Sequence, residues 1–148
     1  MKESIRELEQ LIIQNLQSNS LLKNEVEQKE NEKHDLLKEV SLKIIDVIDS
    51  FENSAEWVAE NDFDKVEEAR KTVSKFKIVH RKLLGLLKSY GVTKIEFPDN
   101  RLIVGLCDVV ETEADSNRKN DEIISVIRNG YIRGKELIRP AQIIVVKN

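Results

Sequence analysis

Residues 1–60 contain neither proline nor glycine, and their apolar side chains return at the spacing of a heptad repeat. The apolar positions are Ile5, Leu8, Ile12, Leu22, Val26, Leu36, Val40 and Val47. A helix this long cannot bury such a stripe against itself, so it needs a partner helix. Polar residues interrupt the stripe at Asn15, Asn19, Lys29, Lys33 and Lys43. We therefore expect residues 1–40 to form a parallel two-stranded coiled coil that melts easily.

The apolar stripe widens between residues 42 and 58, which indicates more than one neighbouring helix. A second helix follows, with Asn61 or Asp62 as its expected N-cap and Gly91 as the glycine that ends it. Because the connection is short, the two helices are expected to pack antiparallel. Two chains would then form a homodimer with a four-helix bundle. The side chains expected to hold this dimer together are Leu36, Val40, Ile44, Val47, Ile48, Phe51, Val73, Phe76, Leu83 and Leu87.

After Gly91 the helical period gives way to short β-rich segments separated by turn residues. Pro140 cannot donate to a ladder, so it should mark the start of a strand or an edge. The expected strands are 92–97, 101–112, 123–128, 131–133, 137–139 and 143–147, with a polar loop over 113–120. The sequence predicts an α+β fold in three parts: a coiled-coil arm (1–40), a helical dimerisation region (41–91) and a β-domain (92–148).

Composition narrows the class of protein. Charged residues make up 34% of the chain and aromatic residues 5%, a profile typical of long helices and coiled coils. The net charge of −3 is too small to imply a nucleic-acid partner. The charged N-terminus does not resemble a signal peptide, and no apolar run approaches the length of a membrane span. We expect a soluble cytoplasmic protein with no membrane partner.

Residues for catalysis or metal binding are scarce. The chain has two histidines, His34 and His80, and one cysteine, Cys107. A His/Cys metal site therefore lacks ligands, and Cys107 lies in an apolar run that suits a buried, inert thiol. The glycines never cluster before a helix as they do in a phosphate-binding loop. These features predict a binding protein rather than an enzyme, with no metal and no cofactor.

Arg139 stands between Ile138 and Pro140 in a segment otherwise made of aliphatic residues. An arginine in such a strand must either reach solvent or form a pair. Two interpretations remain open from the sequence, a structural ion pair and a contact with a partner protein.

The order of parts, a long helical arm, a bundle and a terminal β-domain, resembles the GrpE family, the nucleotide exchange factors of DnaK-type chaperones. The resemblance rests on Val47-Ile48-Asp49-Ser50-Phe51, on Leu83, Leu87 and Tyr90-Gly91-Val92, and on Gly130-Tyr131, Ile138-Arg139-Pro140-Ala141, Ile143 and Val145. Departures include PDNRLIVGLCDVV, where family members usually carry Asp-Pro-x-x-His-x-Ala, together with Lys75, Asn53 and Glu136.

The resemblance implies a homodimer whose β-domain binds the nucleotide-binding domain of a DnaK-type chaperone and promotes ADP release, without binding nucleotide itself. The residues that this implies for the contact are Tyr131, Ile132, Arg133, Lys135 and Arg139, with Val104 or Leu106 as an apolar contact and Lys29, Lys33 and Asn53 on the helices. It further implies that the arm melts reversibly with temperature.

Two other functions compete with this interpretation. One is a dimeric coiled-coil adaptor that displays its β-domains to another partner without exchange activity, which the missing histidine motif and Glu136 favour. The other is an enzyme that uses Cys107.

Overall fold

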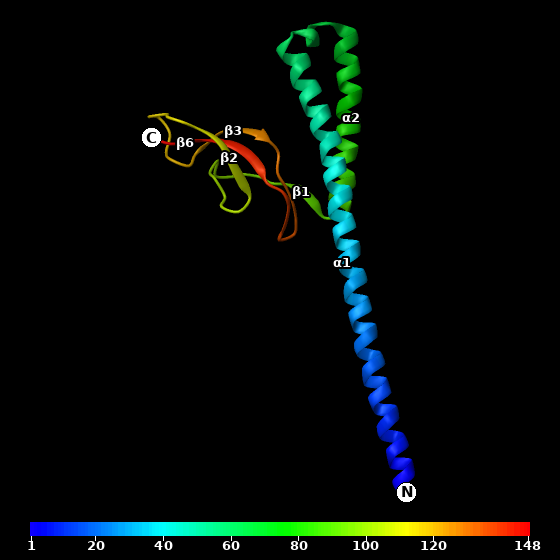
Figure 1. Cartoon of the computed structure of the whole chain (residues 1–148). Helices are drawn as coiled ribbons and strands as arrows, with labels where there is room; N and C mark the ends of the chain where they lie inside the picture. Colours follow the sequence, from blue (N-terminus) through cyan, green and yellow to red (C-terminus); the bar gives the residue numbers. More distant parts are fainter. The chain divides into compact units, whose positions relative to one another are not determined.

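The computed structural model describes residues 1–148, which form two compact units, Met1–Glu39 and Val40–Asn148. The helices are α1 (Lys2–Glu60), the 3-10 turn η1 (Phe63–Lys65) and α2 (Glu67–Ser89). The strands are β1 (Val92–Lys94), β2 (Cys107–Glu113), β3 (Ile123–Arg128), β4 (Tyr131–Arg133), β5 (Glu136–Arg139) and β6 (Ala141–Val146) (Figure 1). This order confirms the predicted α+β fold.

The first unit is a single stretch of α1, and its apolar stripe is exposed. Ile5, Leu8, Ile12, Leu22 and Val26 each keep between 50% and 57% of their surface. A single helix has no second surface against which these side chains could pack, as the heptad pattern indicated.

In the second unit, α2 runs back along the last part of α1 (Figure 1). The Phe51 and Phe76 rings lie 5.7 Å apart between centroids, and Trp57 near the end of α1 stacks on Phe63 in η1. The predicted antiparallel helical hairpin is therefore confirmed. Figure 1 shows the close turn that joins the two helices.

The predicted N-cap of the second helix is wrong. The cap residue of α2 is Val66, and no side chain caps it. Asn61 instead donates from its side-chain amide to the carbonyl of Trp57, while Asp62 adopts a left-handed conformation with φ 58° and precedes η1. The C-terminal end is as predicted: Gly91 follows the cap residue Tyr90 with φ 78°, a conformation that glycine adopts readily.

The β-domain contains two three-stranded sheets. One has the order β1-β4-β5 and is antiparallel throughout. The other has β6 in the centre, with β2 parallel and β3 antiparallel to it. Pro140 lies between β5 and β6, directly before the start of β6 as predicted.

The predicted strand over 101–112 is only partly correct. Its first half is irregular, apart from an isolated bridge between Arg101 and Glu122, and the strand β2 begins at Cys107. Asn100 and Gly105 have φ of 52° and 85°, which interrupts an extended backbone. Cys107 is half-buried at the first position of β2, so the expectation of a buried thiol is also wrong.

Two apolar clusters hold the second unit together. The first joins the helices to the β1-β4-β5 sheet and contains Ile45, Ile48, Leu87, Val92, Tyr131 and Ile138. The second lies in the other sheet and contains Ile123, Ala141, Ile143 and Val145, with Phe97, Leu102 and Cys107 packed against it. Neither α1 nor α2 has a stretch sufficiently long and apolar to span a bilayer.

Candidate functional site

The β4–β5 hairpin contains five of the residues predicted for partner binding: Tyr131, Ile132, Arg133, Lys135 and Arg139. Tyr131 pairs with Arg139, and Arg133 pairs with Glu136 across the turn. Gly134 in the turn has φ 59°, which favours glycine at that position. Lys135 is exposed beside it, and Ile132 and Arg133 are half-buried. The outer end of the hairpin is thus a small surface with two cationic side chains.

Arg133 is held in place by its own hairpin. Its guanidinium lies 2.9 Å from a carboxylate oxygen of Glu136, and the two side chains keep 15% and 25% of their surface. Because a partly buried charge pair restrains both side chains, Arg133 is more ordered than a free surface arginine. Glu136, one of the departures from the family pattern, therefore has a structural contact inside the β-domain.

Arg139 forms the structural ion pair that was one of the two sequence interpretations. Its Nη1 and Nη2 atoms donate to the two carboxylate oxygens of Asp49 at 2.7 and 2.8 Å. Nη2 and Nε also donate to the carbonyl of Asn129. The residue is only 8% exposed. Its partner contact stays a prediction, and its observed role is to connect the β-domain with α1.

Asp49 is the acceptor at the centre of this connection, and the sequence did not single it out for a functional role. It also accepts a hydrogen bond of 2.9 Å from Nε of Arg128. Burial raises the pKa of the Asp49 carboxyl, but the hydrogen bonds and charges of Arg139 and Arg128 outweigh burial and hold the pKa below its ordinary value of 3.8. The sequence feature that could have pointed to Asp49 was the presence of an acidic residue within the widened apolar stripe of the helix.

Tyr131 is the buried side chain that anchors the β4–β5 hairpin in the apolar core. It is 1% exposed and packs in the cluster with Ile45, Ile48 and Leu87, and its hydroxyl has no hydrogen-bond partner. The guanidinium carbon of Arg139 lies 5.5 Å from the ring centroid, within the range of a cation–π contact. The ring is therefore part of the core on which the hairpin rests.

Burial, followed by the negative charges of Glu52 and Asp49, raises the pKa of Tyr131 to about 12. Arg139 acts in the opposite direction and is outweighed. The phenol therefore holds its proton more tightly in the folded protein than in the unfolded chain.

Gly130, before β4, permits the close approach that the domain needs. A Cβ at this position would lie 2.4 Å from the backbone nitrogen of Ala141 and 2.7 Å from Cδ1 of Ile95. Only a residue without a side chain fits between these atoms. Glycine at position 130 is thus a packing requirement of the β-domain.

The remaining predicted contact residues lie on other segments. Val104 is 90% exposed in the segment before β2, and Leu106 is half-buried where its carbonyl accepts a hydrogen bond from the Ala141 amide. Lys29 and Lys33 are exposed on α1 in the first unit. Asn53 is exposed on α1 and lines a small polar pocket together with Arg128, Asn129 and Gln142.

The residues predicted for dimerisation fall into three exposure classes. Ile48 and Leu87 are 0% and 1% exposed within the single chain. Leu36, Val40, Val47 and Phe76 keep 61%, 43%, 48% and 48% of their surface. Ile44, Phe51, Val73 and Leu83 are half-buried. The exposed and half-buried classes together hold eight of the ten residues and keep accessible apolar surface in the single chain, although Ile44 and Leu83 also pack against the chain's own core.

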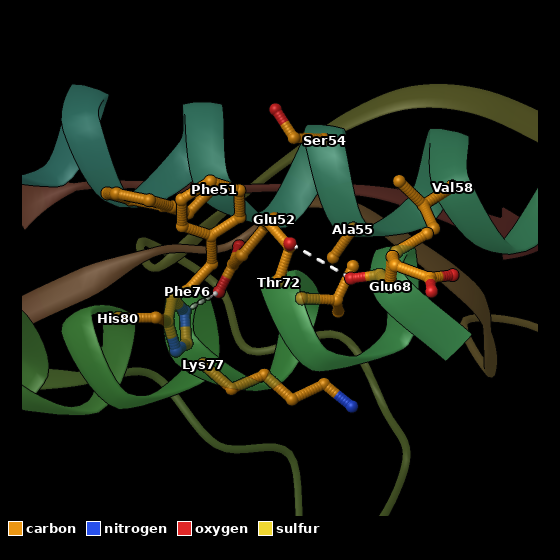
Figure 2. A pocket seen from close by; sticks show the side chains of 12 residues that line it. Phe51, Glu52, Ser54, Ala55, Val58, Glu68, Thr72, Phe76, Lys77 and His80 are labelled. Atoms are coloured by element: carbon orange, nitrogen blue, oxygen red, sulfur yellow. Dashed lines mark hydrogen bonds and ion pairs between the residues drawn. The ribbon is translucent and has the colours of Figure 1, made fainter. Parts of the chain in front are cut away.

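An apolar groove of about 540 Å³ runs between α1 and α2 (Figure 2). Its apolar lining includes Phe51, Ala55, Val58, Val73 and Phe76, and Figure 2 shows side chains of both helices facing it. At one end Nε2 of His80 lies 3.0 Å from Oε1 of Glu52. His80 therefore contacts the other helix of the hairpin. No cluster of three or more His, Cys, Asp or Glu side chains is arranged to hold a metal ion.

Comparison with known proteins connects this architecture with one family. The GrpE family model matches residues 1–147. "Protein GrpE" of Fusobacterium nucleatum subsp. nucleatum is 33% identical over 134 residues, which are 84% of this chain and 61% of the relative. The protein of the same name from Wolbachia pipientis subsp. Culex pipiens is 28% identical over 103 residues, 69% of this chain and 52% of the relative.

A third relative, "Protein GrpE" of Fusobacterium nucleatum subsp. polymorphum, is 29% identical over 151 residues, covering 95% of this chain and 69% of its own length. The chain thus spans between about half and about two thirds of the length of the relatives that it matches. Since the family model covers nearly all of the sequence, the chain belongs to the GrpE family.

Proposed function

We propose that this protein is a nucleotide exchange factor that binds the nucleotide-binding domain of a DnaK-type chaperone and promotes the release of ADP. The family match over residues 1–147 carries this proposal, because members of the GrpE family are exchange factors of DnaK. The protein would act in the cytoplasm, as a co-chaperone in protein folding and the stress response. It would bind no nucleotide and use no cofactor or catalytic residue itself.

The action needs only a difference in affinity between two states of the chaperone. A factor that binds the open nucleotide cleft more tightly than the closed cleft lowers nucleotide affinity by the same ratio. A thousandfold weakening of ADP binding corresponds to about 4 kcal/mol of such preference. That free energy is available only if the binding surface is already ordered, since ordering it on contact would consume part of the interaction energy.

The outer end of the β4–β5 hairpin supports this requirement. Ile132, Arg133 and Lys135 present partly or fully accessible side chains there, and Arg133 is restrained by Glu136. Tyr131 and Arg139 lie behind this end and fix it to the core and to Asp49. We propose that the first three residues touch the chaperone and that the last two support them, with Val104, Leu106, Lys29, Lys33 and Asn53 as further contacts.

The homodimer is proposed from the apolar surface that one chain leaves uncovered. The groove between α1 and α2 has an almost wholly apolar lining, and Val47 and Phe76 are each 48% exposed beside the chain's own core. An amphipathic helix that leaves its apolar stripe exposed in the single chain gains stability when another helix covers the stripe. A second copy that packs its own helices there would complete the four-helix bundle, and pairing of residues 1–40 would cover the arm. The division into arm (1–40), bundle region (41–91) and β-domain (92–148) belongs to this proposal.

Stopped-flow measurement of fluorescent ADP leaving a DnaK-type chaperone tests the proposal. We expect release to accelerate as the protein is added. Complex formation without acceleration would instead establish the structural adaptor, and absence of both would refute the assignment of the partner.

A charge reversal tests the placement of the contact surface. Lys135→Glu is expected to weaken chaperone binding by about tenfold or more, since a rim charge that becomes repulsive costs one or more kcal/mol. Lys147→Glu, a reversal at another exposed lysine after β6, is the matched control and is expected to leave binding unchanged. Equal effects of the two variants would show that the hairpin end is not the contact.

A further inference from the structure

The β-domain is joined to the helices by two contacts of different kind. The first is apolar, where Val92, Tyr131 and Ile138 pack against Ile45, Ile48 and Leu87. Hydrophobic contact is non-directional, since its free energy follows the area removed from water. This contact therefore holds the β-domain against the helices but tolerates small rotations of one surface over the other.

The second contact is a line of polar side chains that begins at Asp49. Arg139 approaches Asp49 with two parallel hydrogen bonds of 2.7 and 2.8 Å, and Arg128 adds a third of 2.9 Å. A two-pronged arginine–carboxylate pair is directional as well as strong. The Asp49 and Arg139 side chains are only 15% and 9% exposed, so water competes weakly for these bonds.

The line continues to the second helix. Arg139 donates to the carbonyl of Asn129, whose side-chain amide donates to Glu52 at 2.9 Å. The other carboxylate oxygen of Glu52 lies 3.0 Å from Nε2 of His80 on α2. At the outer end, Oδ1 of Asp46 accepts a hydrogen bond of 3.0 Å from Nη2 of Arg128. The junction ladder consists of Asp46, Asp49, Glu52, His80, Arg128, Asn129 and Arg139, and it connects α1, α2 and the β-domain.

We propose that Asp49 is a positioning residue for nucleotide exchange, which sets the orientation of the β-domain on the helices through Arg139 and Arg128. This inference rests on the proposed function. Asp49 touches no nucleotide and need not touch the chaperone. A β-domain that can rotate adapts to both the open and the closed nucleotide cleft, so its preference for the open cleft declines.

The test compares the affinity of the protein for the nucleotide-free and the ADP-bound chaperone. Asp49→Asn keeps the shape of the side chain but loses the charge that holds the two arginines. We expect the ratio of the two Kd values to fall by about tenfold, because the coupling between the two ligands is reduced. Arg139→Lys, which cannot form the two-pronged pair, is expected to lower the ratio in the same way.

The ratio separates positioning from simple loss of structure. A variant that is partly unfolded binds both forms of the chaperone more weakly by the same factor, and its ratio does not change. Asp46→Asn is the matched control on the same helix, because the Asp46 side chain is 66% exposed at the outer end of the ladder. Its ratio should stay within about twofold of the wild-type value, as expected for an exposed ion pair. An unchanged ratio in Asp49→Asn would overturn the inference.

A measurement without chaperone keeps this inference distinguishable from the proposed function. Spin labels at Glu56 on α1 and Asn117 after β2, both exposed, report the distance between helix and β-domain by pulsed electron resonance. The labels are placed in a Cys107→Ser background, with excess unlabelled chain so that only distances within one chain are read. Asp49→Asn should broaden the distance distribution and Asp46→Asn should not. If the wild type binds the nucleotide-free and the ADP-bound chaperone with equal Kd, the proposed function fails. If the distance distribution of Asp49→Asn stays as narrow as that of the wild type, the positioning role fails.

Discussion

Replacement of Tyr131 by phenylalanine is expected to stabilise the protein. The Tyr131 hydroxyl is buried in an apolar cluster and has no hydrogen-bond partner, whereas the ring itself packs against Ile45, Ile48 and Leu87. A buried polar group without a partner costs about 1–3 kcal/mol relative to an apolar group of the same shape. Tyr131→Phe removes this group and retains the ring, including its contact with Arg139 at 5.5 Å.

The expected gain in the free energy of unfolding is about 1 kcal/mol, at the lower end of this range because the neighbouring side chains relax only partly. For a unit of this size the gain corresponds to a rise in Tm of about 4 °C. Urea and thermal unfolding followed by circular dichroism measure both values. Tyr90→Phe is the matched control, because Tyr90 is 56% exposed and its loss should change stability by less than about 0.5 kcal/mol.

The alkaline limb of the stability curve provides an independent check of the same reasoning. Because burial raises the pKa of Tyr131 from 10.0 to about 12, the folded protein binds this proton more tightly than the unfolded chain. The associated stability is complete below pH 10 and is lost as the pH rises toward about 12. Tyr131→Phe should remove this loss. A variant that is less stable than the wild type at neutral pH would refute the reasoning and show that the hydroxyl has a partner.

Three further predictions concern other parts of the chain. Gly130→Ala should destabilise the protein by about 1–3 kcal/mol in urea unfolding, because its Cβ would meet the Ala141 backbone. Gly85→Ala, where nothing lies within 4 Å, should instead stabilise helix α2 by about 0.5–1 kcal/mol. Changes in the free energy of unfolding with the same sign in both variants would contradict this prediction. Because the pKa of Asp49 is lowered, its pairing contributes stability above pH 3.8 that is lost as the pH falls through the folded-state pKa. Asp49→Asn should therefore flatten the acid limb of a profile of stability against pH. An unchanged acid limb would argue against the pair. Residues 1–40 should melt in a separate helical transition below the unfolding of the β-domain, seen by circular dichroism, and a single cooperative step would count against reversible arm melting.

The elements predicted best from the sequence are those whose ends are set by residues next to them in the chain. The strands 123–128 and 131–133 were placed at the observed bounds, although β3 and β4 lie in different sheets and form no hairpin with each other, and Gly91 ended the second helix as expected. The N-terminal end of that helix was misplaced. The Asn61 side chain bonds backward to Trp57 rather than forward, and the backbone first makes a 3-10 turn. Both alternatives use the same residue types, so composition alone does not separate them.

The contacts that form the site depend on residues far apart in the chain. Arg139 and Asp49 are 90 positions apart, and their pairing establishes the structural ion pair, while a contact of Arg139 with a partner protein stays a prediction. The parallel pairing of β2 with β6 likewise joins distant segments. Sequence periodicity indicates which face of a strand is buried but not which carboxylate meets a buried arginine. The accessible end of the β4–β5 hairpin contains Ile132, Arg133 and Lys135, which the family resemblance implied as contact residues.

The rate at which ADP leaves the chaperone decides whether this protein is a nucleotide exchange factor. A DnaK-type chaperone carrying fluorescent ADP is mixed with increasing concentrations of the protein in a stopped-flow instrument, in the presence of excess unlabelled nucleotide. For a nucleotide exchange factor, the observed release rate rises with protein concentration and reaches a plateau well above the spontaneous rate. A release rate that stays at the spontaneous value while the protein is fully bound to the chaperone would contradict this function.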